Sequence, residues 1–145
     1  MVSDLLLAYA GLFTWSFLAA TVLPLGSEVA LAALVRAEGR VWAPVLVATA
    51  GNYLGSCTTY WLGRRAAGAF GGARRESVEQ GRAGRMLARY GGPALLLSWV
   101  PVLGDALVAG AGAVGMPFFG FSAWVVTGKA LRYLAVAWAA ARVWP

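Results

Sequence analysis

The chain has 145 residues, of which 60% are apolar and only 12% are charged. A soluble domain carries about a quarter charged residues, so this composition excludes an ordinary soluble enzyme and indicates a membrane protein. The net charge of +6 fits a cationic surface facing anionic lipid better than a nucleic-acid partner. The absence of His and the single Cys exclude imidazole relays, disulfides and thiolate zinc clusters, so we expect no metal and no cofactor.

The first apolar stretch, residues 5–35, is too long to cross a bilayer as one straight helix, because it would extend roughly 46 Å. Pro24 and Gly26 interrupt it. These residues predict a helix that ends before Pro24, a sharp turn, and a short helix over residues 28–35. The short helix cannot cross, so we expect a re-entrant hairpin that is buried in protein or lines a wet cavity.

Residues 41–62 contain no charged side chain and predict a membrane-spanning helix. Trp42 and Trp61 lie near its ends, roughly 28 Å apart along a helix, which matches a hydrocarbon core with an aromatic belt on each side. Gly51 and Gly55 form a small-xxx-small face against which another helix could pack closely. The alternative is that Gly51 and Gly55 have no packing role and only reflect the general enrichment of glycine in membrane helices.

Residues 64–90 form the one hydrophilic segment and hold seven of the 12 basic residues. The positive-inside rule places this segment in the cytoplasm, where its simplest role is a connector that fixes the topology. Arg82, Arg85 and Arg89 share one face of a predicted helix, and Met86, Leu87 and Tyr90 could contact the membrane surface.

The second half of the chain repeats the pattern of the first. Residues 93–114 are interrupted at Pro101 and Gly104, and Pro117 starts a long helix that runs to about residue 141. A shift of 77 residues aligns the unusual positions of the two halves, placing Pro24 on Pro101, Glu28 on Asp105, Gly51 on Gly128 and Asn52 on Lys129.

If each half is one hairpin and one spanning helix, it makes an odd number of crossings and the second half is inverted. We therefore expect an all-α polytopic membrane protein with two re-entrant hairpins in an inverted repeat plus spanning helices. It would form a single domain over residues 1–145. Repeat half one covers about 15–65, the basic cytoplasmic loop 64–90, and repeat half two about 92–142.

Four charged residues lie in these apolar segments. Glu28 and Asp105 each need a partner, water or a proton there, so we predict that they are protonatable gates. The alternative is that each acid only caps a short helix. Lys129 and Arg132 are three residues apart on one helix face and could neutralise the acids or bind a phosphate. The alternative for Lys129 and Arg132 is that their long side chains extend to the membrane–water interface, which is known as snorkelling.

Five motifs together resemble the DedA family, the bacterial proteins with the VTT (SNARE-associated Golgi protein) domain, and within it the small YqaA-like members. The motifs are TVLPLGSE at 21–28, GNYLGS at 51–56, YWLGR at 60–64, SWVPVLGD at 98–105 and GKALRY at 128–133. The resemblance implies a bacterial inner-membrane protein with two facing hairpins, in which Glu28 matches the acid of the first hairpin. It also implies lipid translocation, of undecaprenyl phosphate or phospholipid, with a proposed dependence on the proton-motive force.

The chain departs from the family pattern in both halves. Ser56 stands where family members have an Asp, and Ser98 and Gly104 stand at two arginine positions around Pro101. If those arginines bind phosphate in the relatives, Lys129 and Arg132 must do so here, or the cargo differs.

The function that we expect is a lipid-translocating membrane transporter and not an enzyme. Its partners would be membrane lipids and protons, with no nucleic acid. Two alternatives stay open. One is a proton-coupled transporter of a small solute or ion, and the other is a non-transporting scaffold that binds a partner or anionic lipid through residues 64–90.

Overall fold

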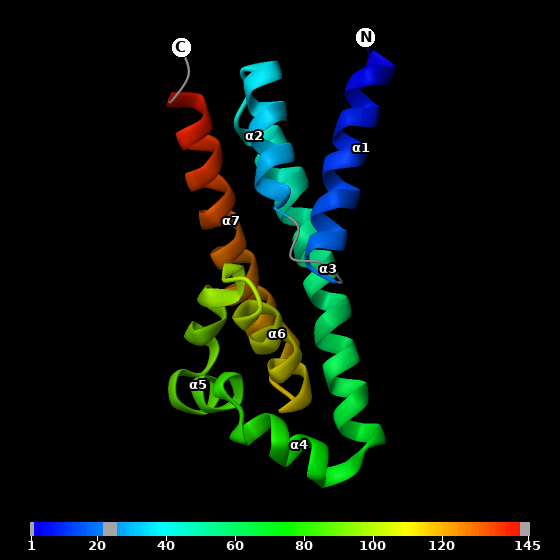
Figure 1. Ribbon diagram of the computed structural model, residues 1–145, viewed down its shortest axis with the longest axis vertical. Helices are drawn as coiled ribbons and strands as arrows, with labels where there is room; N and C mark the ends of the chain where they lie inside the picture. Colours follow the sequence, from blue (N-terminus) through cyan, green and yellow to red (C-terminus); the bar gives the residue numbers. More distant parts are fainter. Residues whose placement is uncertain (1, 22–25, 143–145) are drawn as a thin grey trace. The chain divides into compact units, whose positions relative to one another are not determined.

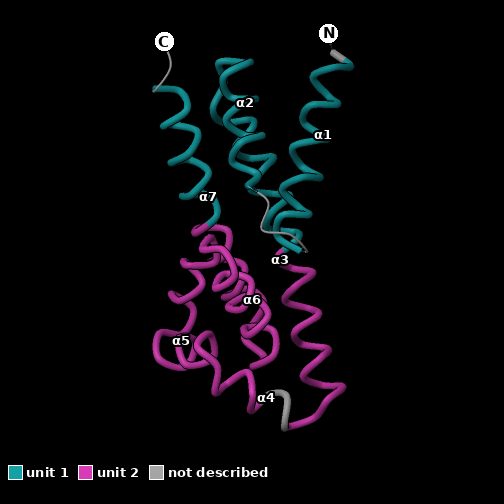
Figure 2. The backbone as a smooth tube through the Cα atoms, in the orientation of Figure 1, with its two compact units in different colours: residues 1–55, 129–145 teal, residues 56–128 magenta. Residues whose placement is uncertain are grey.

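The computed structural model describes residues 2–21 and 26–142, without the side chains of residues 2 and 73–75. Within these ranges the chain forms seven α-helices and one 3₁₀ helix and no strand, which confirms the all-α prediction (Figure 1). The predicted helix break at Pro24 lies outside the described residues. The chain divides into two compact units, residues 1–55 with 129–145 and residues 56–128, and each is described separately (Figure 2).

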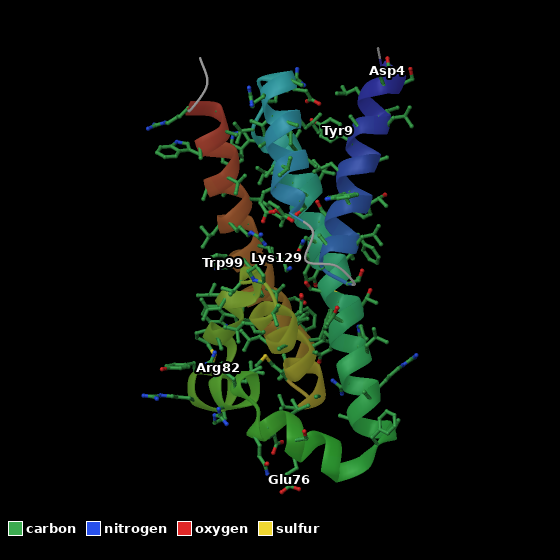
Figure 3. All side chains as sticks on the ribbon, viewed as in Figure 1. Asp4, Tyr9, Glu76, Arg82, Trp99 and Lys129 are labelled. Carbon is green, nitrogen blue, oxygen red and sulfur yellow. The ribbon has the colours of Figure 1, made fainter. Side chains whose placement is uncertain are left out.

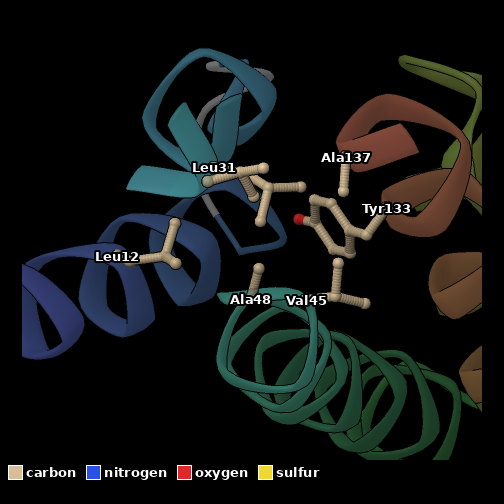
Figure 4. Close-up of a cluster of buried hydrophobic side chains, with 7 residues drawn as sticks. Leu12, Leu31, Val45, Ala48, Tyr133 and Ala137 are labelled. Carbon is tan, nitrogen blue, oxygen red and sulfur yellow. The ribbon is translucent and has the colours of Figure 1, made fainter. Parts of the chain in front are cut away.

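The first unit combines the start of the chain with its end. It contains α1 (Val2–Ala19), α2 (Ser27–Glu38), α3 (Trp42–Ala69) as far as residue 55, and α7 (Phe118–Arg142) from residue 129 onward. Its core takes residues from all four helices, and the phenol ring of Tyr133 lies among aliphatic side chains of α2 and α3 (Figure 4). The core residues are Leu12, Leu31, Val35, Val45, Ala48, Tyr133 and Ala137.

Helix α2 corresponds to the short helix that was expected at residues 28–35, with about one turn more. Gly26 is its N-cap, and Glu28 lies in its first turn, where the positive end of the helix dipole favours an anion. The helix ends at Gly39, whose φ of +66° suits glycine and whose backbone N–H donates to the Val35 carbonyl over 2.9 Å.

Helices α1 and α3 approach each other at glycines of α3. A Cβ atom at Gly51 would collide with the Phe13 carbonyl oxygen, and one at Gly55 would collide with the Phe17 carbonyl oxygen. A larger residue at either position would therefore require α1 to move away.

The second unit contains the rest of α3 and α7 and the helices between them. These are α4 (Gly71–Gln80), α5 (Arg82–Tyr90), the 3₁₀ helix η1 (Gly92–Trp99) and α6 (Leu103–Ala113). The segment expected as a basic loop is thus almost wholly helical. Helix α3 continues through Arg64 and Arg65, and the chain turns only near Gly71, which has a φ of +69°.

The second predicted helix break lies between η1 and α6. Pro101 occupies the turn, and a Cβ atom at Gly104 would collide with the Ser98 carbonyl oxygen, so glycine lets the turn close tightly. Val102 has a φ of +66°, a conformation that a β-branched residue rarely adopts. The two ends of this turn are therefore held against each other by backbone packing.

The two long helices cover the remaining predicted segments. Helix α7 begins directly after Pro117, as expected. Of residues 41–62, which we expected to span the bilayer, all but the first lie within α3. Among residues 2–21 and 26–142, no helix is both long enough and apolar enough to cross a membrane.

Candidate functional site

Polar side chains meet inside the first unit, between helices that are otherwise apolar. The Lys129 ammonium group, on α7, donates a hydrogen bond to Asn52 Oδ1 on α3. Asn52 Nδ2 in turn donates to the Ser16 carbonyl oxygen of α1 over 3.1 Å. Lys129 and Asn52 are each only 4% exposed (Lys129 is labelled in Figure 3). Because a buried ammonium group is costly without polar partners, this chain of hydrogen bonds stabilises the lysine within the unit.

A second charged contact lies one helical turn further along α7. Arg132 Nη2 forms an ion pair with Glu28 Oε1, and their side chains are 27% and 21% exposed. A Cβ atom at Gly26 would lie 3.0 Å from Glu28 Oε2, so the glycine before α2 leaves room for the carboxylate. The structure thus brings together two of the predicted charged residues, Glu28 and Arg132, as a partly buried pair.

A neutral hydrogen bond completes the arrangement. Ser27 Oγ lies 2.6 Å from the Tyr133 hydroxyl oxygen, and both residues are buried. Lys129, Arg132 and Tyr133 follow one another at helical spacing, so one stretch of α7 supplies three of the polar side chains. We call the set the buried polar cluster; it comprises Ser16, Ser27, Glu28, Asn52, Lys129, Arg132 and Tyr133.

Two buried hydroxyl groups, one in the cluster and one on α3 a turn before Asn52, have unused hydrogen-bonding capacity. Ser16 Oγ and Thr49 Oγ1 are buried and make no hydrogen bond within the part of the chain that the structure describes. Buried hydroxyl groups normally have a partner, because leaving one unsatisfied costs about 1–3 kcal/mol. The cluster can therefore take up an additional polar group, such as water or part of a ligand.

The predicted hairpin residues of the second half, Pro101, Gly104 and Asp105, lie in the other unit. Asp105 occupies the first turn of α6, as Glu28 does in α2, and it is exposed. Pro101 is exposed and Gly104 is buried beside it. Each acid therefore follows a helix break and begins a short helix, which is the position that the sequence pattern predicted.

Four members of the cluster, Ser16, Ser27, Asn52 and Tyr133, were not predicted as site residues from the sequence. Ser27 stands directly before Glu28 in the first motif, and Ser16 is a polar residue within an apolar helix, so both carried a weak signal. Within the described ranges, no group of three His, Cys, Asp or Glu side chains could hold a metal ion.

The chain belongs to the VTT domain family, which it matches over residues 3–142, and this confirms the resemblance to the DedA family.

Named relatives make the assignment more specific. The chain is 45% identical over 132 residues to the inner membrane protein YqaA of Escherichia coli (strain K12), covering 90% of this chain and 89% of that protein. The same values apply to the inner membrane protein YqaA of Shigella flexneri. An uncharacterized protein of Haemophilus influenzae is 41% identical over 133 residues, covering 86% and 82%. No solved structure matches the chain. The names of the first two relatives confirm the predicted inner-membrane location.

Proposed function

We propose that this protein is a membrane transporter that moves a lipid headgroup between leaflets, with undecaprenyl phosphate or a phospholipid as its cargo. The observation that carries the proposal is the Glu28–Arg132 ion pair beside the buried Lys129. Two cations and one acid leave an excess of positive charge within an apolar unit. That excess favours a phosphate group whose lipid tail stays in the bilayer.

The ion pair suggests how the headgroup would be admitted. In the resting state the Glu28 carboxylate occupies Arg132. When Glu28 takes up a proton, the pair loses its Coulomb attraction, and the Arg132 guanidinium becomes available to a phosphate. Lys129 adds a second positive charge one turn away. When Glu28 loses the proton it competes for Arg132 again and expels the headgroup. No covalent bond forms or breaks, so the protein acts as a transporter and not as an enzyme.

We further propose that the two halves form re-entrant hairpins in an inverted repeat, with Asp105 as the counterpart of Glu28. Two observations support this. An acid occupies the first turn of both α2 and α6. Asn52 and Lys129, which the 77-residue shift makes equivalent, contact each other, as residues near the axis between inverted repeats would. Protonation of either acid would then open the path from its own leaflet.

The test is lipid translocation in proteoliposomes made with the purified full chain. A fluorescent phospholipid is quenched from outside by a membrane-impermeant reagent, with and without a pH gradient. We expect Glu28→Gln and Asp105→Asn each to lower the protein-dependent rate at least tenfold. Their helix content and elution volume in detergent should remain those of the wild type. The conservative change Arg40→Gln, at an exposed residue, should leave the rate unchanged.

Three outcomes would contradict the proposal. Wild-type rates in both acid variants would remove the acids from the mechanism. A wild-type protein that moves no lipid while driving uptake of a soluble solute would support the second transporter class. A protein that moves neither would support a scaffold.

A further inference from the structure

Helix α5 presents two different faces. Ala83, Gly84 and Leu87 are buried within the second unit, and the buried Leu87 corrects the expectation that it contacts the membrane surface. Arg82 and Arg89 are exposed on the other side of the helix (Arg82 is labelled in Figure 3). The helix is therefore anchored to its unit by small and aliphatic residues while its arginines remain available to a ligand.

An apolar pocket opens beside this helix, between α3, α5 and α6. Its volume is about 630 Å³, within the roughly 300–1,000 Å³ of sites for small molecules. The walls are mostly small apolar residues, such as Ala66 of α3, Ala83 of α5 and Ala106 of α6. Among the described residues that line it, the only charged one is Arg82. The pocket therefore suits a flexible hydrocarbon chain much better than a polar molecule.

A second pocket of about 810 Å³ lies on the outer side of α5 and shares Arg82 with the first. Arg85, Arg89 and Tyr90 also line it, and the Arg89 guanidinium lies 5.3 Å from the centroid of the Tyr90 ring. No acidic residue is among the described residues that line this pocket. The Arg85 guanidinium also donates a hydrogen bond to the Gln80 carbonyl oxygen. Three guanidinium groups favour an anion, and phosphate is an anion that arginine side chains bind well.

We propose that the two pockets form one binding site for a single anionic phospholipid. An acyl chain would occupy the apolar pocket, and the phosphate would be bound by Arg82, Arg85 and Arg89. Arg82 belongs to both pockets, so it marks the junction between chain and headgroup. The half-exposed Tyr90 is a residue type that favours the boundary between lipid and water. This site is separate from the buried polar cluster and does not depend on transport.

The experiment is photo-crosslinking of the full chain in proteoliposomes. The probe is a phosphatidylglycerol with a diazirine in its acyl chain, and the comparison probe is the matching phosphatidylcholine. We expect phosphatidylglycerol to label peptides within residues 63–67 and 101–113 at least three times more strongly than phosphatidylcholine does.

Two variants test the two parts of the site. Arg82→Gln/Arg89→Gln removes charge at exposed positions and should reduce phosphatidylglycerol labelling at least threefold. Arg40→Gln/Arg142→Gln removes the same charge from exposed residues of the other unit and should change nothing. Ala106→Trp, at an exposed position, should fill the apolar pocket and abolish the labelling there.

The proposal is wrong if both probes label equally, or if neither the arginine pair nor Ala106→Trp reduces labelling. Full competition by inorganic phosphate would show a site for a free anion in place of a lipid. Because the arginine variant changes only exposed side chains, it keeps the test decisive even if Ala106→Trp fails to fold.

Discussion

Lys129 on α7 donates a hydrogen bond to Asn52 on α3, and a shift of 77 residues along the sequence aligns these two positions. The contact joins the halves of the chain at a matched pair of polar residues in the long helices. It also places an ammonium group deep inside the first unit, where both residues are 4% exposed. One acceptor of this positive charge is therefore a neutral amide oxygen.

The two residues of this hydrogen bond should respond differently to mutation. Asn52→Leu removes an acceptor from a buried charge and should lower the free energy of unfolding by about 3 kcal/mol. Lys129→Met removes the charge but keeps the length of the side chain, and should cost only about 1 kcal/mol. Unfolding by SDS titration in detergent measures both. A larger loss for Lys129→Met than for Asn52→Leu would contradict this assignment.

The Glu28–Arg132 ion pair should appear as a coupling energy. In a double-mutant cycle with Glu28→Gln and Arg132→Gln, we expect about 1–2 kcal/mol of coupling in the free energy of unfolding. Both side chains are about a quarter exposed, so this value lies below that of a fully buried pair. The same SDS titration provides the four values. Simple additivity of the two single variants would show that the pair does not form.

Tyr133 and Tyr9 offer a matched comparison of two hydrogen bonds. The Tyr133 hydroxyl lies 2.6 Å from Ser27 Oγ in the buried polar cluster, and the Tyr9 hydroxyl donates to Glu38 Oε2 over the same distance (both tyrosines lie in the first unit). Each change to Phe should cost about 1 kcal/mol of stability. Only Tyr133→Phe should slow lipid translocation, because the Tyr133 hydroxyl is hydrogen-bonded to Ser27, which directly precedes the proposed gate Glu28. Equal effects on transport would mean that stability alone controls the rate.

Two glycines of α3 should differ although they lie in one helix. Gly51→Ala introduces a Cβ atom against the Phe13 carbonyl oxygen and should destabilise the protein by about 1–3 kcal/mol. Gly68 has open space around it, so Gly68→Ala should stabilise the helix by about 0.5–1 kcal/mol. Thermal unfolding followed by circular dichroism would show midpoint shifts of opposite sign. A neutral Gly51→Ala would indicate that α1 is not packed there.

Much of the helical framework could be predicted because it depends on local rules. Pro117 and the apolar run after it predicted α7, and Pro101 with Gly104 predicted the break before α6. The placement of both acids in first turns followed from the same pattern. Residues 64–90 were harder: the charges predicted the helix of Arg82, Arg85 and Arg89 and their exposure, but not that α3 continues through Arg65 or that residues 71–80 form α4.

The contacts of the candidate site could be predicted only in part. Charge predicted that Arg132 could neutralise an acid, and the structure pairs it with Glu28. One partner of Lys129 is a neutral amide, and one partner of Tyr133 is a serine. Such neutral partners have no charge or periodicity signal in a single sequence, since they are set by which helix faces pack together.

The most direct test of the account is the pH dependence of headgroup binding. Binding of a short-chain phosphatidylglycerol to the wild-type protein and to Glu28→Gln is measured by calorimetry between about pH 5 and pH 8, where the phosphodiester keeps one charge. If protonation of Glu28 frees Arg132, the wild type should bind at least threefold more tightly at the lower pH. Glu28→Gln should then bind tightly at every pH. An identical pH dependence in both proteins, or weaker binding by the wild type at low pH, would contradict the account.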